Sequence, residues 1–188
     1  MMDPARRVAS ALSALGPVAP DPVTLFVGRV ERSDVPYMVR QIGISGSGAD
    51  PDVVLDLRAA DALRLRPLFP EHAFYVPSDG LISEEAARAR RGRFHIVHRL
   101  TGRRAEVHVA TDDPLFEWAF SRRVRYAGEV TDVWLAPVEY AVLRALESHR
   151  ETGSDADAQR VAALVRSSRR DLDYVELGRW MGRLAREP

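Results

Sequence analysis

The sequence predicts an α+β fold, in which a small mixed β-sheet is packed by helices and followed by a helical C-terminal region. Short apolar segments with strand periodicity alternate with helical segments between residues 21 and 136. From residue 137 onward the apolar residues recur with a helical period. We therefore expect an N-terminal extension at 1–20, an α+β core at 21–136 and a helical region at 137–188.

The composition is that of a soluble globular protein, with 46% hydrophobic residues, 29% charged residues and a net charge of zero. All 27 basic residues are arginine, so a Schiff-base lysine and a Walker-type phosphate loop are excluded. Cysteine is absent, which excludes disulfides, thiol catalysis and cysteine-ligated zinc. No apolar run could span a bilayer, and the apolar residues at 8–18 are too interrupted for the core of a secretory signal. We expect a cytoplasmic protein without a membrane partner.

The first elements extend to residue 65. A weak helix is expected at 5–15, and a second helix begins at Pro22, with Asp21 as its N-cap and apolar residues at helical spacing up to Val30. Strands at 37–42 and 53–57 follow, and then a helix at 58–65.

The next elements include a β-hairpin. Strands at 94–98 and 105–109 alternate in polarity and flank a turn at Thr101-Gly102. Ser83 is the expected N-cap of a helix at 83–91, and Asp113 begins another helix. Short strands are expected at 74–76 and 133–135, and the C-terminal helices at 138–148, 157–165 and 172–184.

The most informative stretch for chemistry surrounds Asp50 and Asp52. Alternate residues of an extended chain face the same way, so both carboxylates can point at one spot. Two like charges held so close favour a divalent cation between them. The alternative is ordinary turn chemistry, in which Asp50 ends the Gly-Ser-Gly turn and Asp52 lies at an exposed start of a strand.

Several segments, in this order, resemble the nucleotidyltransferase fold of the DNA polymerase β superfamily. The most similar groups are the small bacterial minimal nucleotidyltransferases and the abortive-infection toxins. The resemblance covers residues 22–184 and rests on five segments: YMV at 37–39, DPDVVLDL at 50–57, FHIVH at 94–98, TGRRAEV at 101–107 and VEYAVL at 138–143.

The resemblance implies a site and an activity. Asp50, Asp52 and Glu106 match the family's three carboxylates, which hold two divalent cations, Mg²⁺ or Mn²⁺. Gly46 and Ser47 match its phosphate-binding turn, and the pair Arg122 and Arg123 would steady the triphosphate. The implied reaction transfers a nucleoside monophosphate from an NTP to a hydroxyl group of a protein, an RNA or a small molecule.

The chain also departs from the family pattern. Gly46-Ser47 lies almost against Asp50, where the family has a helix between the two motifs. Glu106 replaces the usual Asp, and Ala145 and Arg160 replace a Lys and an Asp found in related toxins. These departures favour an alternative, a catalytically degenerate binding module of the toxin–antitoxin or phage-defence type. The sequence does not predict an oligomeric state.

Two further features leave alternatives open. His108 lies two residues after Glu106 and shares its strand face, so it is either a secondary ligand or phosphate contact, or a partly buried structural histidine. Arginines cluster at 88–93 and 122–125, and they either bind the phosphates of a nucleotide or an RNA or are solvated at helix ends and loops. An RNA-binding protein would show steep salt dependence.

Overall fold

The computed structural model describes residues 22–41, 50–88, 92–110, 113–127 and 132–186. The helix expected at 5–15, the N-cap Asp21 and the turn at Gly46-Ser47 lie outside these residues. The chain divides into two compact units, Met1–Leu135 and Ala136–Pro188.

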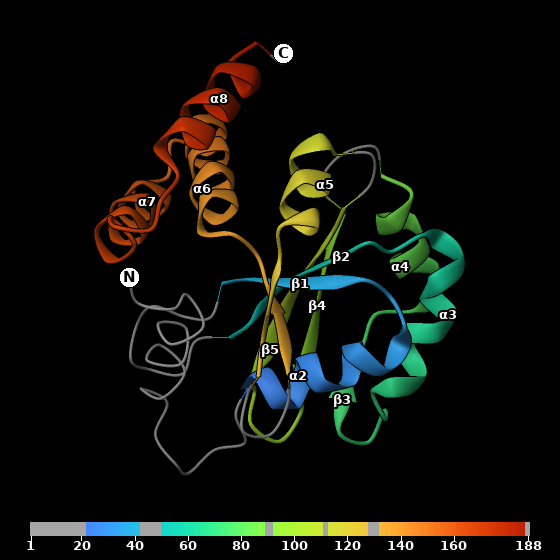
Figure 1. The fold of residues 1–188 in the computed structure, drawn as a ribbon. Helices are drawn as coiled ribbons and strands as arrows, with labels where there is room; N and C mark the ends of the chain where they lie inside the picture. Colours follow the sequence, from blue (N-terminus) through green and yellow to red (C-terminus); the bar gives the residue numbers. More distant parts are fainter. Residues whose placement is uncertain (1–21, 42–49, 89–91, 111–112, 128–131, 187–188) are drawn as a thin grey trace. The chain divides into compact units, whose positions relative to one another are not determined.

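The described residues of the first unit form a mixed sheet of seven strands in the order β3-β4-β5-β2-β1-β7-β6. Figure 1 labels β1 to β5 of this sheet. β2 pairs in parallel with β5, and β1 pairs in parallel with β7, whereas all other neighbours are antiparallel. The expected mixed sheet with packed helices is thereby confirmed. The strands are β1 (Tyr37–Gln41), β2 (Asp52–Leu55), β3 (Phe74–Tyr75), β4 (Gly92–His98), β5 (Arg104–Val109), β6 (Val124–Tyr126) and β7 (Val133–Leu135).

The hairpin predicted around Thr101-Gly102 is confirmed, since β4 and β5 pair antiparallel on either side of it. The N–H of Gly102 donates to the His98 carbonyl at 2.9 Å, and the N–H of His98 donates to the Arg103 carbonyl at 2.7 Å. Gly102 has a φ of 67°, a left-handed conformation that glycine adopts without steric cost. The sequence therefore places a glycine where this turn requires one.

α2 precedes the described strands of the first unit in sequence, and the other helices follow β2, β3 and β5. Asp113 caps α5 as expected, because its carboxylate accepts the N–H groups of Leu115 and Phe116 at 2.9 and 3.3 Å. The expected start at Ser83 is wrong. α4 begins at Asp79, where the hydroxyl of Ser78 accepts the N–H of Leu81 at 3.3 Å. The helices are α2 (Pro22–Val30), α3 (Ala62–Leu65), α4 (Asp79–Ala86) and α5 (Pro114–Ser121), with 3₁₀ turns at Glu31–Ser33, Ala59–Asp61 and Arg66–Leu68.

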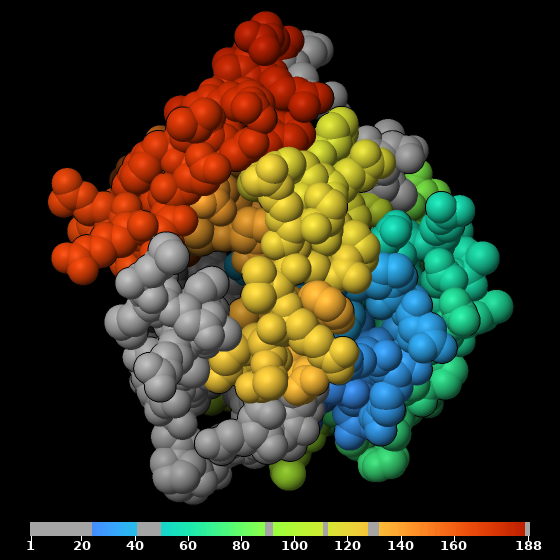
Figure 2. All heavy atoms as spheres, viewed as in Figure 1, coloured from blue at the N-terminus to red at the C-terminus, as the bar shows by residue number. Residues whose placement is uncertain are grey.

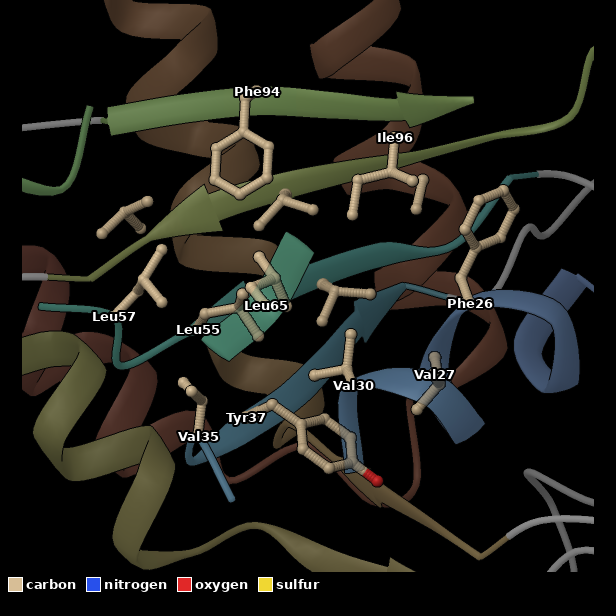
Figure 3. Packing of buried hydrophobic residues seen from close by; sticks show 14 of the residues in the cluster. Phe26, Val27, Val30, Val35, Tyr37, Leu55, Leu57, Leu65, Phe94 and Ile96 are labelled. Atoms are coloured by element: carbon tan, nitrogen blue, oxygen red, sulfur yellow. The ribbon is translucent and has the colours of Figure 1, made fainter. Parts of the chain in front are cut away.

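One face of the sheet carries the hydrophobic core of this unit (Figure 3). Alternate residues of four adjacent strands point into it, and α2 contributes an apolar stripe at helical spacing. Phe26 and Leu55 have no exposed surface. The strand residues of this core include Tyr37, Val39, Val53, Leu55, Phe94, Ile96, Ala105 and Val107, and α2 supplies Phe26, Val27 and Val30.

The outer surface over this core is formed partly by α2 and the segment containing α3, which lie next to each other (Figure 2). A terminal nitrogen of Arg29 donates to the carbonyl of Leu68 at 3.1 Å. The guanidinium carbon of Arg29 also lies 4.8 Å from the centre of the Phe74 ring. Arg29 therefore ties the N-terminal helix to the segment that follows β2.

The opposite face of the central strands is formed by the alternate residues, and many of them are polar. Met38 and Val54 pair across β1 and β2 and are buried, yet they lie outside the core cluster. Two positions further along this face are two charged residues, Arg40 at the C-terminal end of β1 and Asp52 at the N-terminal end of β2. Glu106 lies beside Asp52 in the middle of β5.

In the second unit, residues 136–186 form three helices, α6 (Val138–Thr152), α7 (Asp155–Ser167) and α8 (Tyr174–Leu184). The three C-terminal helices predicted from the sequence are thereby confirmed. The buried carboxylate of Glu139 accepts the N–H of Asp173 at 2.7 Å, which joins the start of α6 to the cap of α8. No helix in the described ranges combines the length and the apolar character needed to cross a bilayer.

Candidate functional site

The candidate site begins with two acids on adjacent parallel strands. Asp52 is the first residue of β2 and pairs in register with Glu106 in β5. Because the neighbours of Glu106 in β5, Ala105 and Val107, point into the core, Glu106 and His108 point to the opposite face. The predicted sharing of one strand face by Glu106 and His108 is confirmed, with 3.6 Å between Nε2 of His108 and Oε1 of Glu106.

Arg40 reaches the same place from β1. The β1–β2 register shifts between Val39, which pairs with Val53, and Gln41, which pairs with Asp52. Arg40 is therefore the extra residue at this irregularity, and it follows Val39, whose partner Val53 is the neighbour of Asp52. Its Nε donates to Oδ2 of Asp52 at 2.8 Å, and one terminal nitrogen donates to the same oxygen.

His108 completes a cluster of four side chains, Arg40, Asp52, Glu106 and His108, which we call the β1–β2–β5 cluster. Nε2 of His108 lies 3.0 Å from Oδ1 of Asp52 and 3.1 Å from a terminal nitrogen of Arg40. A guanidinium can only donate hydrogen bonds. Nε2 therefore accepts from Arg40 when it carries no proton, and donates to Asp52 when it carries one.

The environment of Asp52 favours its ionised form. The side chains of Asp52 and Arg40 are only 12% and 16% exposed. Burial raises the pKa of the Asp52 carboxyl, but the hydrogen bond with His108 and the charge of Arg40 outweigh it, and this pKa lies below its usual value. Asp52 is therefore an anion at neutral pH whose charge is already balanced by neighbouring protein groups.

Asp50 lies at the edge of this cluster and has a different partner. Its Oδ1 accepts the backbone N–H of Arg104 at 3.2 Å, and its Oδ2 lies 3.5 Å from Nε of the same arginine. Glu106 has an arginine neighbour in β4, with 4.0 Å between its Oε1 and a terminal nitrogen of Arg93. Asp52 and Glu106 thus lie on neighbouring strands, Asp50 lies two residues before β2, and each of the three carboxylates has an arginine within 4.0 Å.

The predicted phosphate contacts Arg122 and Arg123 follow α5. The guanidinium of Arg123 lies 3.5 Å from the Phe120 ring centre and 4.6 Å from that of Trp134, and it donates to the carbonyl of Phe120 at 3.2 Å. Arg123 is thereby built into the packing of this region. Arg122 is exposed, with its guanidinium 5.3 Å from the centre of the Trp118 ring. Their role toward a nucleotide stays a prediction.

Other predicted positions lie elsewhere. Gly46 and Ser47 fall outside the described residues. Ala145 is buried in α6, and Arg160 in α7 lies 3.6 Å from Asp157, one turn earlier in the same helix. Both belong to the second unit.

The donor set of the first unit suits a divalent cation in its chemistry. Asp50, Asp52 and Glu106 provide hard carboxylate oxygens, which Mg²⁺ and Mn²⁺ prefer. As the side chains stand, no group of three or more His, Asp or Glu among the described residues is arranged around a possible metal position. Oδ2 of Asp52 is taken by Arg40. The oxygen donors and the negative charges of the acids suit a divalent metal ion. Arg40 competes with such an ion for the carboxylate of Asp52.

Arg40 is the functional residue that the sequence analysis missed. In the strand YMVRQ it reads as an ordinary exposed position, because the local pattern does not show that β1 pairs with β2 next to Asp52. The only signal is indirect, since a buried carboxylate needs a cationic partner and Arg40 is a nearby arginine in a neighbouring strand.

Comparison with known proteins gives no identification. No family model matches this chain, and neither a curated protein nor a solved structure matches it.

Proposed function

We propose that the first unit is a nucleotidyltransferase-like domain whose acids at the start of β2 and in β5 bind an NTP with Mg²⁺ or Mn²⁺. The observation that carries this proposal is the register of Asp52 with Glu106 on adjacent parallel strands, with Asp50 two residues before Asp52. An RNA-binding surface gains nothing from three neighbouring carboxylates, because they repel phosphate. We keep the expectation that the protein acts in the cytoplasm.

The proposed reaction is the transfer of a nucleoside monophosphate. A hydroxyl oxygen of a protein, an RNA or a small molecule forms a bond to the α-phosphorus of the NTP, and the bond from that phosphorus to the bridging oxygen of the β-phosphate breaks. Pyrophosphate leaves. The bound metal supplies charge neutralisation for the triphosphate.

The chain's own residues have distinct roles in this proposal. Asp50 and Asp52 hold the cations, and Asp52 is suited to this because it stays ionised at neutral pH. Glu106 completes the set and receives the proton of the attacking hydroxyl, since it is the most exposed of the three acids, with 37% of its side chain accessible. Arg122 is the better candidate for the triphosphate, because it is exposed, whereas Arg123 is partly buried against Phe120 and Trp134.

A second candidate is the catalytically degenerate binding module of the toxin–antitoxin or phage-defence type. It is favoured by the hydrogen bonds of Arg40 to Asp52, which balance the carboxylate without a metal. In that case the first unit would keep its fold and dock a protein partner.

Calorimetry with a nonhydrolysable NTP and Mg²⁺ or Mn²⁺ separates the two candidates. The wild-type chain is compared with Asp52→Asn and with the control Glu71→Gln, which alters a carboxylate that is 78% exposed and pairs with Arg66. A nucleotidyltransferase-type site predicts metal-dependent binding that is retained in Glu71→Gln and lost in Asp52→Asn, and transfer of label from an NTP should follow. If the wild type does not bind, or if Asp52→Asn binds equally well, the proposed activity is wrong.

A further inference from the structure

The contact between Arg40 and Asp52 differs from the other ion pairs around the three acids. Arg40 donates from two nitrogens to one carboxylate oxygen, and a terminal nitrogen also lies 3.1 Å from Nε2 of His108. Its side chain is 16% exposed, whereas those of Arg93 and Arg104 are 68% and 64% exposed. Exposed ion pairs contribute little free energy, but a pair withdrawn from water resists separation.

The charges around the acids already balance. Asp50, Asp52 and Glu106 carry three negative charges, and Arg40, Arg93 and Arg104, which lie within 4.0 Å of them, carry three positive charges. A divalent cation that joins this set without displacing an arginine would leave a positive excess in a partly buried place. Cation binding therefore favours the departure of one arginine. Of these three arginines, Arg40 is the one that donates to the buried acid, at Oδ2, while Nε2 of His108 lies 3.0 Å from Oδ1.

We propose that Arg40 is a built-in counter-ion that occupies the metal-binding side of Asp52, so that a divalent cation binds only when Arg40 releases this carboxylate. This inference rests on the proposed function, because it takes the acids as the metal-binding set. It assigns a regulatory role to a side chain that belongs to no expected motif. The strand pairing gives the physical basis, since Arg40 and Met38 alternate on the face of β1 that lies beside Val54 and Asp52 of β2, and Arg40 is therefore next to the start of β2.

The proposal is tested with metal alone, on the full chain and without nucleotide. Mn²⁺ affinity is measured from the electron paramagnetic resonance signal of the free ion for the wild type, Arg40→Gln and Arg93→Gln. Arg93→Gln is the matched control, because it removes the same charge from beside Glu106 without altering the contact to Asp52. We expect Arg40→Gln to bind Mn²⁺ on the order of tenfold more tightly than the wild type, because Arg40 no longer competes for Asp52. This corresponds to about 1.4 kcal/mol of binding free energy. Arg93→Gln should stay within about threefold of the wild type, since its pair is exposed.

Two further variants complete the test. Arg40→Lys keeps the charge but loses the forked contact, so it should give a smaller gain, and it also serves if Arg40→Gln does not fold. In the double variant Arg40→Gln/Asp52→Asn the gain should disappear, because the released carboxylate is then missing. Equal gains in Arg40→Gln and Arg93→Gln would show a general charge effect and overturn the proposal, as would the absence of any gain in the folded Arg40 variants.

The outcomes for this proposal and for the proposed function are distinguishable. A gain in Arg40→Gln together with a wild type that neither binds nor transfers a nucleotide supports the role of Arg40 and refutes the activity. Metal-dependent transfer by the wild type with no gain in Arg40→Gln supports the activity and refutes the role of Arg40.

Discussion

Replacing Asp52 by Asn should lower the stability of the first unit much more than replacing an exposed acid. The change removes the anion that faces Arg40 and His108, and the side chains of Asp52 and Arg40 are only 12% and 16% exposed. Breaking a fully buried pair costs about 3–5 kcal/mol. Because both side chains keep some contact with water and Asn can still accept one hydrogen bond, we expect a loss of about 2–3 kcal/mol.

The assay is urea unfolding at neutral pH, with Glu71→Gln as the control. Glu71 also pairs with an arginine, at 2.5 Å from Arg66, but its side chain is 78% exposed, so we expect a loss of at most about 1 kcal/mol. If Asp52→Asn costs no more than Glu71→Gln, the reasoning from burial is refuted.

The difference in stability between the wild type and Asp52→Asn should depend on pH. The pKa of Asp52 is held below its usual value in the folded chain, because the effects of His108 and Arg40 outweigh that of burial. The folded state therefore binds this proton less readily than the unfolded state, whose ordinary Asp pKa is about 3.9. The stability that Asp52 contributes is fully present above that value and is lost as the pH falls through the folded pKa. The difference in unfolding free energy between the wild type and Asp52→Asn should become smaller as the pH falls through this acidic range. A constant difference would contradict the lowered pKa of Asp52.

Three other predictions follow from the described residues. Gly92→Ala should cost more than about 2 kcal/mol in urea unfolding, because its Cβ would lie 2.0 Å from a backbone carbonyl oxygen of α4, whereas Gly178→Ala meets no atom within 4 Å and should be neutral or stabilising. Burial, and next the charge of a nearby glutamate, raise the pKa of Tyr37 to about 12, so Tyr37→Phe should remove the phenol that ionises near that pH in an ultraviolet titration. Arg123→Ala should destabilise the chain through lost aromatic contacts, whereas Arg122→Ala should weaken NTP binding with little change in unfolding free energy.

Each of these predictions has an outcome that contradicts it. Equal unfolding free energies for the two glycine variants would mean that α4 shifts to accept a methyl group. If the ultraviolet titration of Tyr37→Phe is the same as that of the wild type, the phenol that ionises near pH 12 belongs to another tyrosine. If Arg122→Ala is as unstable as Arg123→Ala, then Arg122 also acts through packing.

Much of the fold was predictable because it depends on local signals. Asp113 followed by a proline identifies the start of α5, and Thr101-Gly102 identifies the hairpin. The start of α4 was predicted at Ser83, since this serine precedes two glutamates, but Ser78 is the residue whose hydroxyl faces the free N–H groups. β6 was missed because its three residues are largely exposed and carry no apolar alternation.

The candidate site was predictable only in part. The shared face of Glu106 and His108 follows from strand periodicity. The pairing of Asp52 with Glu106 and the contact of Arg40 with Asp52 both depend on which strands become neighbours and in which register they pair. Neither is encoded within a few residues, so local patterns cannot reveal them.

The parallel pairing of β2 with β5 also affects the order of folding. The two strands are separated in sequence by the whole segment that forms α3, β3, α4 and β4. Closing so long a loop has an entropic cost that local hairpins avoid, and parallel pairing of distant strands is correspondingly slow. We expect the β4–β5 hairpin to form early and β2 to dock on it later, which hydrogen exchange during refolding would detect. Asp52 and Glu106 would then meet only near the end of folding, so a partly folded chain would not yet present the paired acids to a metal ion.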